Sequence, residues 1–140
     1  MSLAMSREER EAFLAALHVG VVSMNRENFG PLSAPIWYAF ENGEISFAIG
    51  ETSRKSALMN VGERISLVVQ TEAAPYQYVS VEGPIESRTA ADLDRDIRPL
   101  AIRYLGEQAG NQYADATGDS GQLLVKMKPE KWLSVDYRKA

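Results

Sequence analysis

Alternating apolar and polar residues predict β-strands along most of the chain. In residues 44–49, Ile45, Phe47 and Ile49 fall on one face, and the residues between them are small or polar. Asn42-Gly43 is typical of a two-residue hairpin turn, so the preceding strand is expected to pair with residues 44–49. The predicted strands are residues 18–24, 32–40, 44–49, 64–70, 76–88, 122–128 and 131–135.

Helical spacing of apolar residues predicts a helix near the N-terminus and a short helix over residues 56–61. Ser6 and Glu9 have the spacing of a capping box, in which each residue satisfies a free backbone N–H near the start of a helix. Phe13 and Leu14 follow on what would be the buried face. The first helix is therefore expected to cover part of the strand core.

A longer helix is predicted after Thr89 and Asp92, which have capping spacing. Its apolar positions are Leu93, Ile97, Leu100, Ala101, Tyr104 and Leu105. Pro99 falls inside this pattern and predicts a kink or a split into two segments. Residues 106–121 are polar and punctuated by glycine, which predicts a connector or a mobile lid with at most a short helix.

Proline and glycine mark the places where the predicted sheet bends. Pro35 cannot donate a ladder hydrogen bond, so it is expected at a sheet edge or a bulge. Gly83-Pro84 interrupts the strand over residues 76–88 and is predicted to be a bulge that lets the sheet curl. Curling antiparallel strands with few helices favour a mainly β fold, namely a small β-barrel with peripheral helices. Residues 1–140 are expected to form a single domain.

The composition fits one soluble, intracellular domain. A chain of 140 residues is long enough to bury a core, and it has no cysteine, which excludes disulfides and suits a reducing cytoplasm. No run approaches the ~18 apolar residues of a membrane span, so a cytoplasmic protein without membrane contact is expected. Residues 1–5 are expected to be a vector-derived or disordered tail; they are left out of the predicted fold, and no function is expected to depend on them.

The charge balance disfavours nucleic acid as a partner. The net charge is −4, from 15 basic and 19 acidic residues, and neither sign forms a long block. A duplex-binding protein gathers lysine and arginine on one face, whereas the tight basic pair here is Arg54-Lys55. A small anion is therefore the better match, and an aromatic barrel that binds single-stranded nucleic acid is the less favoured alternative.

That basic pair belongs to the segment Thr52-Ser53-Arg54-Lys55, which joins a predicted strand to a predicted helix. A helix start offers unpaired backbone N–H groups and a partial positive charge, and two cations beside it strengthen the attraction for an anion. The hydroxyls of Thr52 and Ser53 are further donors. The segment predicts a phosphate site, although two exposed side chains on an ordinary surface helix explain the same pattern.

Other side-chain chemistry is sparse. The one histidine, His18, lies far in sequence from any serine elbow, which disfavours a serine hydrolase, and without cysteine a metal site is not expected. We therefore interpret His18 as a partly buried structural residue and assign no catalytic side chain. An anion pocket with aromatic strand surfaces suits a protein whose chemistry comes from a cofactor; Trp37, Tyr38 and Phe40 could line a slot for it or belong to the core.

Several motifs in their order along the chain resemble one family, the pyridoxamine-phosphate-oxidase-like, FMN-binding split β-barrels, and within it the deazaflavin-dependent oxidoreductase branch. The motifs are Val19-Gly20-Val21-Val22-Ser23, Gly30-Pro31, Ala34-Pro35-Ile36-Trp37-Tyr38, Thr52-Ser53-Arg54-Lys55, residues 64–69, residues 78–83 and residues 132–137. The resemblance extends over residues 7–138. It implies a Greek-key antiparallel split barrel that works as a homodimer, with the cofactor in a groove between the subunits.

The resemblance also implies the cofactor and the residues that hold it. The cofactor would be FMN or an 8-hydroxy-5-deazaflavin coenzyme, with its phosphate at Arg54 and Lys55 and with Thr52 and Ser53 as donors. Pro35, Ile36 and Trp37 would run beside the ring, and Phe47, Ala48 and Ile49 would support it from the neighbouring strand. The partner subunit would contribute Tyr76, Gln77 and Tyr78.

The C-terminal segment differs from that of pyridoxamine phosphate oxidase, the enzyme that gives the family its name. Residues 132–140 lack the arginine-containing substrate motif of pyridoxamine phosphate oxidase, so vitamin oxidation is not expected. The resemblance instead implies an oxidoreductase that passes hydride to a small conjugated organic substrate. The alternative is a carrier of the same fold that binds flavin, deazaflavin or haem without turnover.

Overall fold

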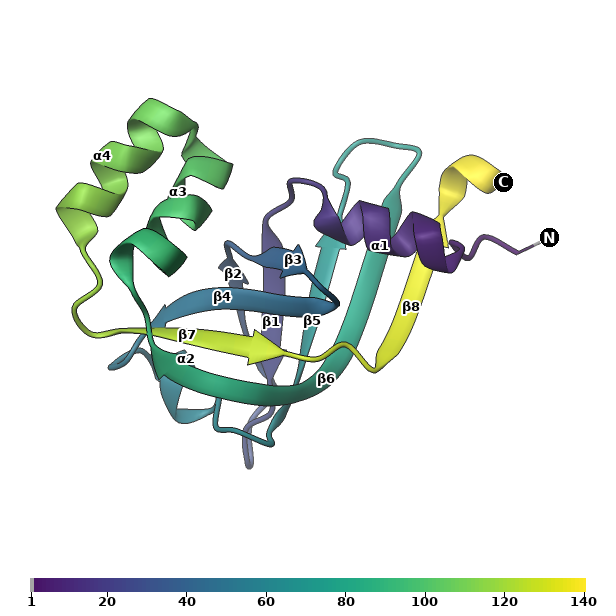
Figure 1. Cartoon of the computed structure of the whole chain (residues 1–140). Helices are drawn as coiled ribbons and strands as arrows, with labels where there is room; N and C mark the ends of the chain where they lie inside the picture. The colour runs from purple at the N-terminus through teal and green to yellow at the C-terminus, as the bar shows by residue number, and fades with distance from the viewer. Residues whose placement is uncertain (1) are drawn as a thin grey trace.

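The computed structural model describes residues 2–140, and its centre is a curled antiparallel sheet (Figure 1). The strands are β1 (Gly20–Met24), β2 (Leu32–Ile36), β3 (Ala39–Glu41), β4 (Glu44–Gly50), β5 (Arg64–Gln70), β6 (Gln77–Ala90), β7 (Gln122–Met127) and β8 (Lys131–Asp136). The helices are α1 (Arg7–Ala15), α2 (Arg54–Ala57), the π-helical turn η1 (Leu93–Ile97), α3 (Arg98–Leu105), α4 (Glu107–Thr117) and the 3-10 turn η2 (Tyr137–Lys139). The predicted mainly β architecture with peripheral helices is confirmed.

The order of the strands across the sheet is β2-β1-β5-β6-β7-β4-β3, and β8 also pairs with β6. The long strand β6 joins the two halves, because its first part pairs with β5 and β8 and its last part with β7 (Figure 1). Helices α3 and α4 lie together at one end of this arrangement, and α1 lies at the other end beside both chain termini. In the part of the chain that is described, no helix has the length and hydropathy of a membrane span.

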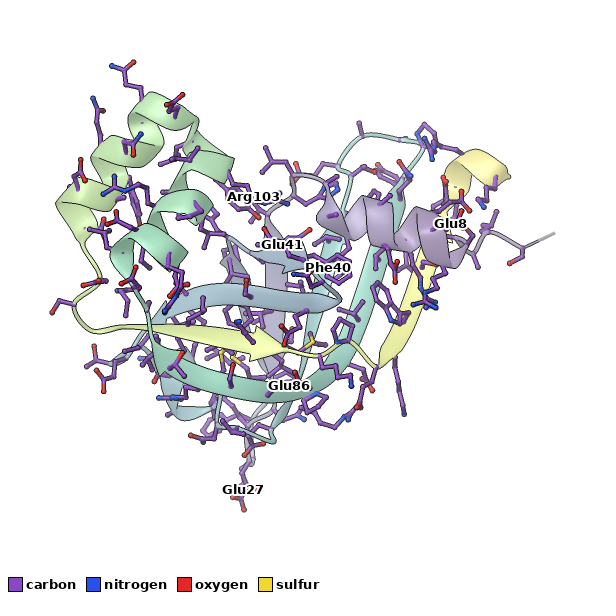
Figure 2. All side chains as sticks on the ribbon, in the orientation of Figure 1. Glu8, Glu27, Phe40, Glu41, Glu86 and Arg103 are labelled. Atoms are coloured by element: carbon purple, nitrogen blue, oxygen red, sulfur yellow. The ribbon has the colours of Figure 1, made fainter. Side chains whose placement is uncertain are left out.

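The bulge in β6 is not where the sequence predicted it. The register between β6 and β7 shifts between Ile85 and Ser87, so Glu86 is the extra residue, and Figure 2 places it on the outside of the bend. Gly83 keeps the regular ladder and has a different role, because a β-carbon there would overlap the carbonyl oxygen of Lys128. Glycine is needed at this position for a close backbone approach.

The hairpin between β3 and β4 has the predicted turn. Asn42 and Gly43 both have positive φ, 53° and 75°, as a primed two-residue turn requires. The alternation in β4 is also as predicted, since Ile45, Phe47 and Ile49 are all at most 2% exposed. The predicted strand over residues 32–40, in contrast, is two strands, β2 and β3, separated at Trp37-Tyr38.

Helix α1 closes the core as predicted, with both capping-box hydrogen bonds of Ser6 and Glu9 formed and Leu14 fully buried. Met5, which the sequence analysis left outside the fold, is 7% exposed and belongs to the core, and its N–H donates to the Ser134 hydroxyl (3.0 Å). The expectation of a non-contributing tail is therefore wrong for Met5. Of the remaining predicted tail, Met1 lies outside the described residues.

Pro99 splits the predicted long helix into η1 and α3, where the proline occupies the first turn of α3. The prediction for residues 106–121 is wrong, because α4 is a helix of 11 residues packed antiparallel beside α3 (Figure 1). Gly110 permits this packing: a β-carbon there would lie 2.5 Å from the Cα atom of Ile102. The backbones of the two helices touch at this glycine.

Candidate functional site

A cavity of about 370 Å³ lies between the end of β4, the short helix α2 and the α3–α4 pair. Its lining contains six of the residues that the sequence analysis assigned to a cofactor: Pro35, Ile36, Trp37, Ala48, Ile49 and Lys55. The remaining lining residues are Val19, Gly50, Ile97, Leu100, Tyr113, Thr117 and Gln122. The cavity is therefore mostly apolar, with one lysine at its edge.

The strand wall of the cavity is formed where β2 ends and where β4 exposes its outer face. Pro35 lies in β2, an edge strand, and pairs with Val21, so its missing N–H leaves no gap in the sheet interior. Ala48 projects from the outer face of β4, opposite in direction to the buried Phe47. A small residue at this point leaves open space above the strand.

Trp37 connects the strand wall to the helices. Its ring stacks on the ring of Tyr104 (centroids 5.2 Å apart, planes 6° apart) and meets Tyr113 at a tilt (5.3 Å, 56°). Tyr104 also fixes α3 to the strands, because its hydroxyl donates to the carbonyl oxygen of His18 (2.5 Å) and accepts from the N–H of Tyr38 (3.1 Å). These contacts position the aromatic side of the cavity.

We expect Tyr104→Phe to lower the free energy of unfolding by about 1–2 kcal/mol, because the Tyr38 N–H and the His18 carbonyl would lose a partner in a partly buried place. The matched control is Tyr113→Phe, since the Tyr113 hydroxyl has no hydrogen bond within residues 2–140. Urea unfolding of both variants measures the difference. Equal stability of the two variants would contradict the anchoring role of Tyr104.

Of the four residues predicted to hold a phosphate, Lys55 is the one that lines the cavity. It is half-buried and makes no ion pair or hydrogen bond through its ammonium group within residues 2–140. Arg54 and Thr52 are exposed and do not line the cavity. The Ser53 hydroxyl donates to the carbonyl oxygen of Gly50 (2.7 Å), so its proton is already engaged.

The helix α2 begins at Arg54, two residues earlier than predicted, and has only four residues. Arg88 on β6 holds its C-terminal end, where the guanidinium donates to the Ser56 hydroxyl (2.6 Å), to the Ser56 carbonyl and to the Met59 carbonyl (3.1 Å). A cation at the C-terminal end of a helix is favourable. Arg88 thus fixes the helix that carries Lys55 onto the sheet.

The other predicted site residues lie elsewhere in this chain. Phe47 is 1% exposed and points into the core, so it does not support a ring in the cavity as predicted. Tyr76, Gln77 and Tyr78 are at the far end of β6, where Gln77 and Tyr78 pair with β8 and the Tyr76 carbonyl accepts from the N–H of Tyr137 (2.9 Å). Their assignment to a partner subunit stays a prediction.

Two side chains that could have lined an aromatic slot belong to the core instead. Tyr38 is fully buried, its hydroxyl donates to the Leu14 carbonyl (2.6 Å), and burial raises its pKa. Phe40 packs edge-on against Trp132 beneath α1 (Figure 2). Trp37 is thus the aromatic residue of this segment that faces the cavity.

The contribution of α4 to the cavity was not predicted from the sequence. Tyr113 and Thr117 are four residues apart and line the cavity from one helical face. The signal was present, because Gly110 and Ala114 share the same spacing on the face that α4 buries. Small residues four apart indicate a helix that packs closely on a neighbour.

His18 is half-buried, directly precedes Val19 of the cavity lining, and stacks on Phe13 (ring centroids 4.4 Å apart, planes 27° apart). Burial lowers its pKa below the usual 6.5, and its Nε2 atom is buried without a hydrogen-bond partner in the described chain. Within residues 2–140, no three histidine or acidic side chains gather where a metal ion could bind.

A family model described as pyridoxamine 5'-phosphate oxidase matches residues 6–136. The chain belongs to the pyridoxamine 5'-phosphate oxidase family. The match includes every element that lines the cavity. No curated protein matches the sequence significantly.

Solved structures share the fold of this pyridoxamine 5'-phosphate oxidase family member. The conserved hypothetical protein Rv2991 from Mycobacterium tuberculosis superimposes with a TM-score of 0.80 at 21% identity, over 99% of this chain and 89% of that one. An F420 reductase gives 0.74 at 18% identity (88% and 94% covered), and an FAD-binding protein from Mesorhizobium loti gives 0.67 at 15% identity (94% and 94%). The predicted split β-barrel is confirmed by these similarities.

Proposed function

We propose that this protein is an oxidoreductase that binds a flavin-type cofactor in the cavity beside Lys55 and uses it to reduce a small conjugated organic substrate. The observation that carries the proposal is the pairing of Lys55, a half-buried lysine without an anionic partner in residues 2–140, with an apolar slot along Ile36 and Trp37. A half-buried cation is costly without an anion, and a phosphate group supplies one.

The residues of the cavity fit a tricyclic redox cofactor. Pro35, Ile36 and Trp37 would flank its ring system, Ala48 leaves room for it, and Lys55 would hold its phosphate. When bound, such a cofactor would supply the hydride, and a proton from solvent would complete the reduction of the substrate, so the main tasks of the protein would be binding and orientation.

The names of two structural neighbours support a cofactor of this class: one is an F420 reductase and the other an FAD-binding protein. Within the class we propose a deazaflavin coenzyme in preference to FMN. The absence of the arginine-containing C-terminal motif argues against vitamin oxidation, and the single lysine with an exposed Arg54 beside it suits a phosphate followed by further acidic groups.

We further propose that the functional unit is a homodimer. Strand register aligns Pro35, Val21, Val68, Ser80 and Leu133 in one row across the outer face of β2, β1, β5, β6 and β8. Val21 is 37% exposed and Leu133 is 58% exposed. A two-fold partner on this face would cover the row, which begins at the cavity, and would bring its Tyr76, Gln77 and Tyr78 toward that cavity.

The proposal is tested by titrating the protein separately with FMN and with reduced deazaflavin, followed by absorbance and fluorescence. We expect saturable binding of deazaflavin and, in single turnovers, oxidation of the bound reduced cofactor by enones, quinones or tetrapyrroles. Binding without oxidation by any of these acceptors would favour a carrier. Absence of binding for both cofactors would overturn the proposed function.

A further inference from the structure

A second cavity, of about 860 Å³, lies on the other side of η1 and α3 and has no part in the proposed function. Its floor is the outer face of β3, β4, β7 and β6, and its walls come from η1 and α3. In Figure 2, Arg103 and Glu41 point into the space between α3 and α1 above this floor. Leu124 on β7 lines this cavity and packs with Ile97 of η1, whereas its cross-strand partner Ala48 on β4 lines the first cavity.

Lys126 lies in the middle of the floor. Strand register aligns it with Ser46 on β4 and Ser87 on β6, so a hydroxyl-bearing residue flanks it on each side. Cross-strand neighbours of this kind have β-carbons about 4.5–5.5 Å apart, which allows one ligand group to reach all three side chains.

The ammonium group of Lys126 is not part of an ion pair among residues 2–140, although it lies near a carboxylate that is: the pKa of Asp96 is lowered by its hydrogen bond from Arg95 and also by the charge of Lys126. Lys126 is half-buried and forms no ion pair within residues 2–140, a combination that it shares with Lys55 in the first cavity. The exposed lysines Lys128 and Lys131 have free access to water, whereas half-buried Lys139 is paired with Glu9 (2.8 Å). Each of the two cavities is therefore lined by a half-buried lysine that forms no ion pair.

The charges around Lys126 leave an excess of one positive charge. Asp96, whose side chain is 7% exposed, is held by Arg95 through two hydrogen bonds (2.8 and 3.0 Å), so this pair cancels internally. Arg103 donates to two carbonyl groups at the end of α1, which do not neutralise its charge. Lys126 and Arg103 together then face one carboxylate, that of the exposed Glu41.

The remaining lining decides the chemical class of the ligand. Pro99, Leu100 and Leu124 supply an apolar wall next to the two hydroxyls and the lysine. The excess of one positive charge matches a ligand with one negative charge. The apolar wall favours a ligand that also carries an apolar group, because burying that group is favourable. The geometry points to a binding site for an organic monocarboxylate, with its carboxylate at Lys126 between Ser46 and Ser87 and its apolar body against Leu100.

Octanoate and benzoate are suitable probes, with 1-octanol as the uncharged analogue and inorganic phosphate as the anion without an apolar body. Calorimetric titration of the full chain without cofactor is expected to give saturable binding of at least one carboxylate. Lys126→Gln should weaken that binding about tenfold or more, because a charge-assisted hydrogen bond is lost. Lys128→Gln, an exposed lysine just beyond the same strand, should leave it unchanged.

Lys55→Gln tells the two cavities apart. Carboxylate binding that survives Lys55→Gln and falls with Lys126→Gln supports the second site whether or not the protein binds a flavin-type cofactor. If Lys126→Gln does not fold, Ser87→Val replaces it, since valine suits a strand and removes one hydroxyl; binding is then expected to weaken severalfold. The inference would be overturned if Lys55→Gln alone abolished carboxylate binding, or if no saturable binding occurred at millimolar carboxylate. It would also be overturned if 1-octanol bound as tightly as the carboxylates or if phosphate bound more tightly.

Discussion

Lys55→Ala is expected to weaken cofactor binding by about 1.5–3 kcal/mol, roughly 10- to 150-fold in the dissociation constant, which is the range for a hydrogen bond to a charged group. The effect should be large because Lys55 is the cationic residue that lines the cavity and Arg88 fixes the helix that carries it. Fluorescence titration with the cofactor that binds the unaltered protein measures the change.

Arg54→Ala is the matched control for this prediction, because Arg54 is the adjacent cation but is exposed and does not line the cavity. Exposed charges contribute less than half-buried ones, so its effect on binding should be the smaller of the two. Neither change should lower the free energy of unfolding appreciably, since neither side chain makes an ion pair within residues 2–140. A dissociation constant that Lys55→Ala leaves unchanged would contradict the assignment.

Strands with one face in the core were the most predictable. In β5, Ile65, Leu67 and Val69 alternate with partly exposed residues, and a shift of one residue would reverse the two faces. Local turn chemistry was equally direct, since Asn42 and Gly43 have the positive φ angles that their residue types predicted. Such features depend on residues that are neighbours in sequence.

Features that depend on distant backbone contacts were not predictable in this way. Gly83 interrupts an apolar pattern, which indicated a bulge, but the glycine is required by Lys128, 45 positions later in the chain, and the bulge falls at Glu86. The break at Trp37 is set by Tyr104, whose hydroxyl accepts from the backbone N–H of Tyr38. Neither partner could be identified from the local sequence.

The candidate site also has a part that local sequence predicted and a part that depends on distant contacts. Pro35, Trp37, Ala48 and Lys55 come together as predicted because short connections link their strands and α2, so sequence order nearly fixes their positions. The helical wall with Tyr113 was not predicted, because glycine and polar residues in succession are also typical of a connector. In α4 most of the polar residues are exposed, and the glycine faces α3.

Gly110→Ala is expected to lower the free energy of unfolding by up to about 3 kcal/mol, although alanine is the better helix former by about 1 kcal/mol. The new methyl group would lie 2.5 and 2.6 Å from the Cα and N atoms of Ile102 and 2.8 Å from the carbonyl carbon of Ala101. These are backbone atoms of α3, which cannot rotate away as a side chain would. The helices must separate, and the wall that carries Tyr113 must move away from Trp37.

Urea unfolding measures the cost. Cofactor affinity reports the displaced wall, as does the tryptophan fluorescence, to which Trp37 and Trp132 both contribute. Gly30→Ala makes the same chemical change where no atom lies within 4 Å of the new β-carbon, so it should leave stability and binding nearly unaltered. The outcome that would contradict the close packing is a Gly110→Ala protein more stable than the original, because that is what helix propensity alone predicts for a glycine inside α4. Reduced stability together with weaker cofactor binding would connect the α3–α4 contact to the shape of the cavity.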